Sequence, residues 1–448
     1  MCYFIYLSIL NNKIVYYAFC EVIILEKNAI FGDLIHQIST RIKSKDFLIS
    51  QRRNSKSFTR KRKMPFENLL FFMLNSAKRS TQIELTDYMG LFTTHKNITK
   101  SAYCQQRMNL KHEAFIELND DFVNGFYEKA EYTKWNDFRI VCIDGSTLLL
   151  PYSNKIREEF GVNSDTNNVP MSRVTTLYDP LNDLMIDSLI SPNNSAEIRM
   201  AVEHFQKLKN GDLLLLDRGF GARWLFYILL HKKIDFVIRI QREFGKDVDS
   251  FWESKETSKI ILVEELPQKS KKILGEIPPF KFRLVKVFLE NGEIEVLATS
   301  LFDEIKYPPE IFKNLYFLRW GIETNYDHLK NHIEIGNFSG YTPLVIKQDF
   351  YANVLISNIQ SLIIKDAQLK LDEQKKELQY KYKINKNLSL GYMKNKLIKI
   401  LMSNSKNQYE ELVELFLIEP VPIRRGRKFP RHPKRHKKRF YINKKRSI

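Results

Sequence analysis

The stretch from 316 to 330, YFLRWGIETNYDHLK, contains four polar side chains of types that act on phosphate esters. On a helix that turns about 100° per residue, Tyr316, Arg319, Glu323 and Lys330 fall within about 60° of one another. A carboxylate can hold a metal ion, while guanidinium and ammonium groups bind phosphate oxygens. The spacing predicts a helix with a polar row suited to phosphodiester chemistry. A solvated helix face with ordinary charges is the alternative.

Apolar side chains accompany this row at helical spacing and predict that the helix is anchored in a core: Leu318, Ile322, Tyr326, Leu329 and Ile333. His328 and His332 have the i, i+4 spacing of a possible metal pair. Because they project roughly opposite Glu323, we interpret them as solvent-facing polar residues.

Two aspartates upstream could join Glu323. In RIVCIDGSTLLLP (139–151) a short apolar β run is expected to end at Asp144, and the fully apolar run DLLLLD ends at Asp217. Taken singly, each has a simple alternative: Asp144-Gly145 is a turn signal, and Asp217 could be a turn or cap residue. Together, both could sit at strand ends of one sheet, where Glu323 would add a third carboxylate.

The segments around the aspartates predict the elements that must position them. SRVTTLYDP and DLMIDSLISP read as strands, 195–209 as a helix with Ser195 as N-cap, and 234–240 as a further strand. A second helix is expected to start near Ala222. Adjacent strands followed by alternating helices and strands predict a mixed α/β sheet.

The motifs together resemble those of insertion-sequence DDE transposases of the IS-four type. Tyr-x2-Arg-x3-Glu-x6-Lys matches the family's signature, and an Asp after the first strand and Asp-Arg-Gly-Phe after a later strand occur in the family's order. The similarity runs from about residue 55 to the C-terminus. It implies an α/β fold with a ribonuclease-H-like catalytic core, a β-strand insertion, an N-terminal helical DNA-binding region and C-terminal helices.

By this resemblance, Asp144, Asp217 and Glu323 are the catalytic metal-binding triad, and Tyr316, Arg319 and Lys330 contact the DNA end. Mg²⁺ prefers such hard oxygen ligands, so two Mg²⁺ ions are expected, with Mn²⁺ able to substitute. The expected function is cut-and-paste DNA cleavage and strand transfer at terminal inverted repeats, by a homodimer when bound to DNA ends. A nuclease of the same fold without strand transfer and an inactive transposase-derived DNA-binding protein are the alternatives.

The regions outside the core have their own signatures. SKIILVEEL, FKFRLVKVFL and EIEVLATSL, the last after an Asn291-Gly292 turn, predict a β insertion or an independent β domain. Short helices with basic connectors over 55–110 suit a module that reads a terminal sequence, or a packing subdomain without DNA contact. The predicted domains are an apolar extension (1–40), a helical DNA-binding region (41–130), the first part of the core (135–245), the insertion (246–302), the catalytic helix (303–342), a C-terminal helical region (343–422) and a basic tail (423–448).

The formal net charge of +19 favours a polyanionic partner, nucleic acid before membrane. Residues 424–448 contain thirteen Lys or Arg and no acid, and 41–63 contain ten against Asp46 alone. We expect the tail to be a phosphate-binding arm, with a solubilising tail as the alternative. Four scattered cysteines favour a reducing cytoplasm over zinc or disulfides: Cys2, Cys20, Cys104 and Cys142. The resemblance implies a location in the bacterial cytoplasm, associated with the nucleoid. The apolar N-terminus is broken by polar residues, so no membrane span or signal peptide is expected, although an amphipathic anchor remains an alternative.

Overall fold

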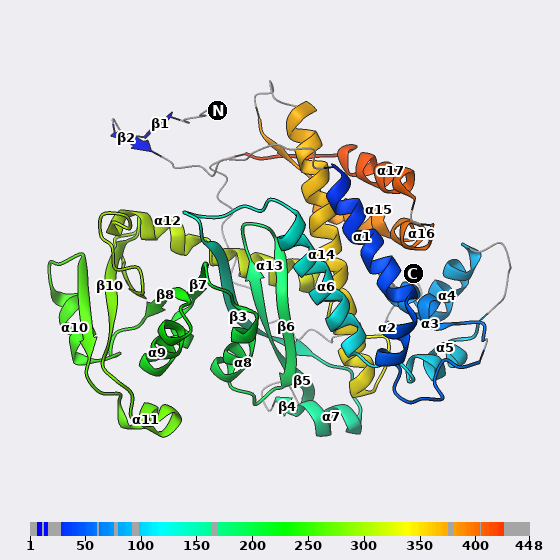
Figure 1. Ribbon diagram of the computed structural model, residues 1–448, viewed down its shortest axis with the longest axis horizontal. Helices are drawn as coiled ribbons and strands as arrows, with labels where there is room; N and C mark the ends of the chain where they lie inside the picture. Colours follow the sequence, from blue (N-terminus) through cyan, green and yellow to red (C-terminus); the bar gives the residue numbers. More distant parts are fainter. Residues whose placement is uncertain are drawn as a thin grey trace.

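The computed structural model (Figure 1) describes residues 7–10, 13–16, 28–60, 62–75, 79–91, 98–163, 168–374, 380–403 and 405–424. Residues 1–6, 11–12 and 17–27 of the apolar N-terminal extension and residues 425–448 of the basic tail lie outside this part of the chain. Short strands β1 (Leu7–Leu10) and β2 (Lys13–Tyr16) pair as an antiparallel hairpin.

A single mixed sheet forms the centre of the molecule. Its first strands are the five predicted around the aspartates: β3 (Arg139–Leu149), β5 (Val169–Asp179), β6 (Leu184–Pro192), β7 (Asp212–Leu216) and β8 (Asp235–Ile240). They lie in the order β6-β5-β3-β7-β8, with β3–β7 and β7–β8 parallel and the other pairs antiparallel. This order and these directions are those of a ribonuclease-H-like core, as predicted. A two-residue strand, β4 (Val162–Asn163), pairs with the start of β5.

The β insertion extends this sheet and is not an independent domain. Strand β11 (Ile294–Thr299) pairs with β8, β10 (Phe280–Phe288) pairs with β11, and β9 (Ser258–Val263) forms the outer edge. Two short helices that the sequence analysis missed accompany these strands: α10 (Lys246–Glu253) and α11 (Gln268–Leu274). The insertion lies at the left in Figure 1.

Helices cover both faces of the sheet because its central strands are apolar on both sides. Helices α8 (Glu197–His204) and α9 (Arg223–His231) bury their apolar residues on one face. The other face is covered by α6 (Glu113–Lys129), α13 (Trp320–Asn331) and the 32-residue α14 (Pro343–Gln374). Helix α8 is shorter than predicted, and its N-cap is Ala196, not Ser195.

The N-terminal helices pack beside the core (Figure 1, right). Helices α3 (Phe66–Met73), α4 (Thr81–Gly90) and α5 (Lys100–Arg107) occupy the predicted helical segment, with Pro65 and Thr99 as N-caps of the first and third. Helices α1 (Asn28–Lys43) and α2 (Lys45–Gln51) precede them, and α7 (Asn154–Phe160) follows β3. Residue 40, where the extension was expected to end, lies inside α1.

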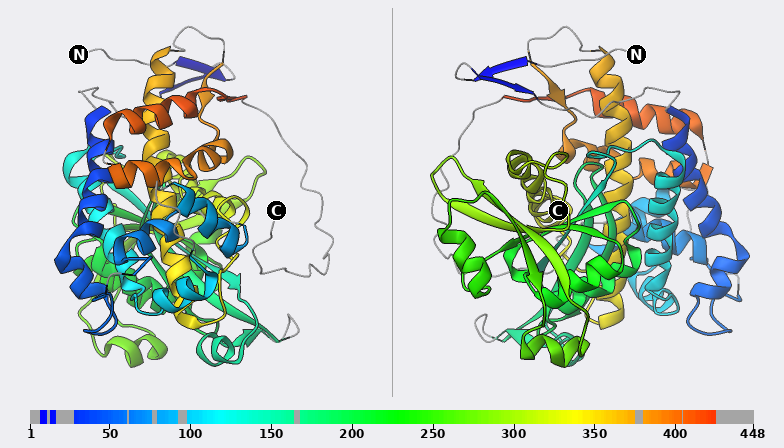
Figure 2. Two further views of the ribbon diagram at one scale, coloured as in Figure 1. Left: turned by 90° about the vertical axis from the view of Figure 1, so that its right-hand side faces the viewer. Right: turned by 60° about the vertical axis from the view of Figure 1, so that its left-hand side comes forward.

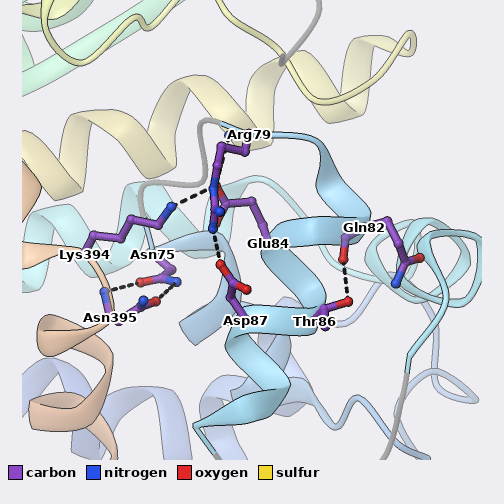
Figure 3. Close-up of polar contacts among 8 residues, drawn as sticks. All are labelled: Asn75, Arg79, Gln82, Glu84, Thr86, Asp87, Lys394 and Asn395. Carbon is purple, nitrogen blue, oxygen red and sulfur yellow. Dashed lines mark hydrogen bonds and ion pairs between the residues drawn. The ribbon is translucent and has the colours of Figure 1, made fainter. Parts of the chain in front are cut away.

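The C-terminal helices join the N-terminal ones to α14, which runs the length of the molecule in both views of Figure 2. They are α15 (Lys386–Met393), α16 (Lys396–Ser403) and α17 (Lys406–Leu417). In Figure 3, the ammonium of Lys394 and the Arg79 side chain both contact the buried carboxylate of Glu84, and Asn75 and Asn395 bond to each other. This polar contact fixes α4 against the α15–α16 connection.

Candidate active site

The parallel register of β3 and β7 brings Asp144 and Asp217 next to each other. Ile143 is paired with Leu216, and the next residue in each segment is an aspartate. Asp217 follows the end of β7 as predicted, but Asp144 lies inside β3, which continues to Leu149, and not at the end of a strand. Neighbouring strands lie about 4.8 Å apart, which places the two carboxylates at the same point of the sheet. Burial, with smaller contributions from the charges of Glu323 and Asp217, raises the pKa of Asp144 to about 6, although a hydrogen bond from the Gly145 amide and the charge of Arg319 act in the opposite direction.

Two tyrosines dock the signature segment on these strands. The Tyr316 hydroxyl donates to the Leu216 carbonyl oxygen (3.1 Å), and the Tyr326 hydroxyl donates to the Asp144 carbonyl oxygen (2.8 Å). The predicted apolar stripe is buried at Ile322, Tyr326, Leu329 and Ile333, while Leu318 is partly buried. The aligned polar row therefore faces the strands that carry the aspartates.

The segment is two helices, not the single helix that was predicted. Helix α12 (Phe312–Phe317) ends before α13 begins at Trp320, and the amides of Leu318 and Arg319 bond to carbonyls three residues back. Such bonds tighten the chain locally. Arg319 thus lies at the junction and acts as the N-cap residue of α13.

Arg319 is buried, with 2% of its surface exposed. Its guanidinium lies over the rings of Tyr316 and Trp320, 5.6 and 5.0 Å from their centroids, and donates to Glu323 (3.0 Å). The Glu323 side chain is 41% exposed. Arg319 therefore contacts the Glu323 carboxylate from the protein interior, while the carboxylate itself is partly exposed to solvent.

Lys330 is exposed, and its side chain lies beside strand β3. Its ammonium donates to the Ser146 hydroxyl (2.5 Å), two residues beyond Asp144 on the same strand. Residues i and i+2 of a strand share a face, so Lys330 and Asp144 are on the same side of the sheet. The cation lies at the surface beside the carboxylates.

Arg239 is a site residue that the sequence analysis missed. From β8 its Nη2 and Nε contact Asp217 Oδ1 at 2.8 and 3.0 Å, and its Nη1 contacts Glu295 Oε1 at 2.6 Å. Burial alone would raise the pKa of Asp217, but the Arg218 amide and the Arg239 guanidinium hold it below its usual value. Only the polar interruption of the apolar run IDFVIRI could have drawn attention to Arg239.

Comparison with known proteins agrees with this geometry. The family model described as "Transposase DDE domain" matches residues 135–359, which span half of the chain and include all three carboxylates. The chain belongs to the DDE transposase family. Transposase InsG for insertion sequence element IS4 of Escherichia coli (strain K12) is 19% identical over 387 residues, which cover 83% of this chain and 86% of InsG. This supports membership of the IS-four group and a function as a DNA transposase.

A solved structure of the piggyBac transposase, in a synaptic complex with hairpin DNA, is also similar. It has a TM-score of 0.45 and 11% sequence identity, over 88% of this chain and 86% of that one.

His328 of this transposase is not solvent-facing, so the interpretation from the sequence was wrong. It is buried, and its Nε2 pairs with Gln360 Oε1 of α14 (3.1 Å). Burial lowers the pKa of His328 to about 4, with a smaller contribution from the charge of Lys386. The helical projection failed because α14 covers the side of α13 away from Glu323.

Asp144, Asp217 and Glu323 come from two neighbouring strand segments and a helix, and their carboxylates are the type of ligand that a hard divalent cation prefers. Nevertheless, within the described ranges no three His, Cys, Asp or Glu side chains are placed to hold a metal ion. Asp217 is instead paired with Arg239, and Glu323 with Arg319.

In the part of the chain that the structure describes, no helix is long and apolar enough to cross a membrane.

Proposed function

We propose that this transposase cleaves and joins DNA at a site formed by Asp144, Asp217 and Glu323, with Mg²⁺ as the natural metal and Mn²⁺ as a substitute. The observation that carries the proposal is the register that makes Asp144 and Asp217 neighbours on parallel strands, beneath the helix of Glu323. Asp144, Asp217 and Glu323 would hold two metal ions, which would supply activation of a water or 3′-hydroxyl and neutralisation of charge on the leaving oxygen.

The other signature residues have distinct tasks in this proposal. Lys330 is exposed beside Asp144 and would bind a phosphate of the scissile strand. Tyr316 fixes the strand end that carries Asp217 through the Leu216 carbonyl. Arg319 is too buried to reach DNA without rearrangement, so we assign it the positioning of Glu323 instead of the DNA contact expected from the resemblance.

The remaining parts would bring DNA to this site. We propose that the helical region (41–130) binds the terminal inverted repeats, that the basic tail holds phosphates, and that a homodimer pairs two ends for cut-and-paste transposition in the bacterial cytoplasm. A related DNA nuclease without strand transfer differs in product, since it would release ends but never join them.

The test is incubation of the full-length protein with DNA that carries the element's own ends, in Mg²⁺ or EDTA, with products sized on a gel. Cleaved and joined products are expected in Mg²⁺ and absent in EDTA. Asp217→Ala should abolish both products while end binding persists. Asp327→Ala is the matched control, because Asp327 is an exposed acid on the same helix as Glu323. Cleavage by the Asp217 variant at the normal rate would overturn the assignment.

A further inference from the structure

Arg239 contacts two carboxylates that belong to different parts of the sheet. Asp217 follows β7 in the catalytic core, whereas Glu295 lies on β11 in the insertion. Strand β8 stands between β7 and β11, and Arg239 on β8 is paired in register with Leu297, two residues from Glu295. The guanidinium therefore bridges the core and the insertion at the position of a proposed metal ligand.

The two contacts of Arg239 differ in what they do to the metal site. A guanidinium on Asp217 Oδ1 supplies positive charge to an oxygen that a metal ion also needs, so the two cations compete for this carboxylate. A lone arginine that gave up Asp217 would lose its charge-assisted hydrogen bonds. Glu295 offsets this loss of hydrogen bonds, because Arg239 already donates to it through Nη1 at 2.6 Å.

Building on the proposed function, we infer that Arg239 holds Asp217 in the metal-free protein and shifts onto Glu295 when a divalent cation binds. Glu295 is then a positioning residue that sets metal affinity, although it touches neither metal nor DNA. The insertion then takes part in metal binding, because Glu295 lies on β11.

Static electrostatics offers a competing account. Removing any positive charge near a cation site strengthens cation binding, and removing any negative charge weakens it. If the geometry does not change, these Coulomb contributions to metal affinity add in a double variant. An exchange of partners is not additive, because Glu295 acts through the Arg239 side chain and has no role without it.

The experiment is Mn²⁺ titration of the full-length protein without DNA, in which electron paramagnetic resonance measures free Mn²⁺. Glu295→Gln should weaken binding about tenfold, as loss of outer-shell partners commonly does. Arg239→Met should strengthen it, and the double variant should bind like Arg239→Met alone. Glu293→Gln is the matched control, since Glu293 is an exposed acid two residues from Glu295, and it should leave affinity unchanged.

Equal effects of Glu295→Gln with and without Arg239, or no effect at all, would overturn the exchange. Loss of Mn²⁺ binding in Asp217→Asn shows separately that the titration reports the proposed site. Equal binding by wild type and Asp217→Asn would refute the proposed site itself. If thermal melting in EDTA shows that Arg239→Met does not fold, Arg239→Lys replaces it. An ammonium cannot bridge both carboxylates as a guanidinium fork does, so the effect of Glu295→Gln should shrink in that background.

Discussion

Replacing Arg319 with alanine is expected to destabilise the protein as well as to slow cleavage. The guanidinium lies against two aromatic rings, and each contact contributes about 0.5 to 2 kcal/mol depending on its desolvation. Its bond to Glu323 adds less than a buried ion pair, because the Glu323 side chain is 41% exposed and screened by water. In the opposite direction, Arg319 Nε is buried without a hydrogen-bond partner, and removing it relieves that penalty. We therefore expect a net loss of folding free energy of about 1 to 2 kcal/mol.

The assay is urea unfolding followed by circular dichroism, beside single-turnover cleavage of a labelled transposon end. Arg242→Ala is the matched control: Arg242 also stacks on a tryptophan, Trp252, at 5.2 Å, but its side chain is 68% exposed. We expect a clearly lower urea midpoint for the Arg319 variant and nearly the wild-type midpoint for the Arg242 variant. Arg319→Lys should recover part of the cleavage rate, since an ammonium keeps the charge but not the planar contact. Equal midpoints for both alanine variants would refute the structural role of Arg319.

Three further predictions separate surface contacts from buried ones. Lys330→Ala should slow cleavage about ten- to hundredfold, because one charge-assisted phosphate contact is lost, and should leave the urea midpoint unchanged. A normal cleavage rate would show that Lys330 is not part of the site. Deleting residues 424–448 should weaken binding to any DNA duplex and make the binding affinity less dependent on salt in fluorescence anisotropy titrations, while sequence preference persists. Unchanged salt dependence would show that the tail does not bind DNA phosphates. His328 has a folded-state pKa of about 4, below its ordinary value of 6.5, so the unfolded chain binds more protons between these pH values and stability falls as pH falls. The loss at pH 5 is on the order of 2 kcal/mol, and urea unfolding of His328→Gln at pH 7 and pH 5 should lack this component.

The central strands and the neighbouring positions of Asp144 and Asp217 were predictable because their signals are local. Apolar runs such as DLLLL are long enough to specify buried strands, and an acid that ends such a run stands out. Strand order is also constrained by the alternation of strands and helices. The adjacency of Asp144 and Asp217 follows once β3 and β7 are parallel neighbours.

The missed features depend on partners that are remote in the chain. His328 has the polarity of a surface residue, and its burial depends on Gln360 in a helix that packs over it. The Arg239–Glu295 contact joins side chains that are brought together by the pairing of β8 with β11. The break between α12 and α13 occurs in a sequence without proline, where helical periodicity continues across the junction. Local pattern does not contain this information.

The central position of α14 has a consequence for synthesis of the protein on the ribosome. Helices α1 and α6 are made early, but both pack against α14, and α1 also packs against α16. At about 5 to 20 residues per second, roughly 15 to 60 seconds separate the synthesis of Lys43 from that of Pro343. During this time the apolar faces of the early helices lack their final partners. A nascent chain interrupted before α14 is therefore expected to aggregate or be degraded, and not to persist as a truncated fragment that occupies transposon ends.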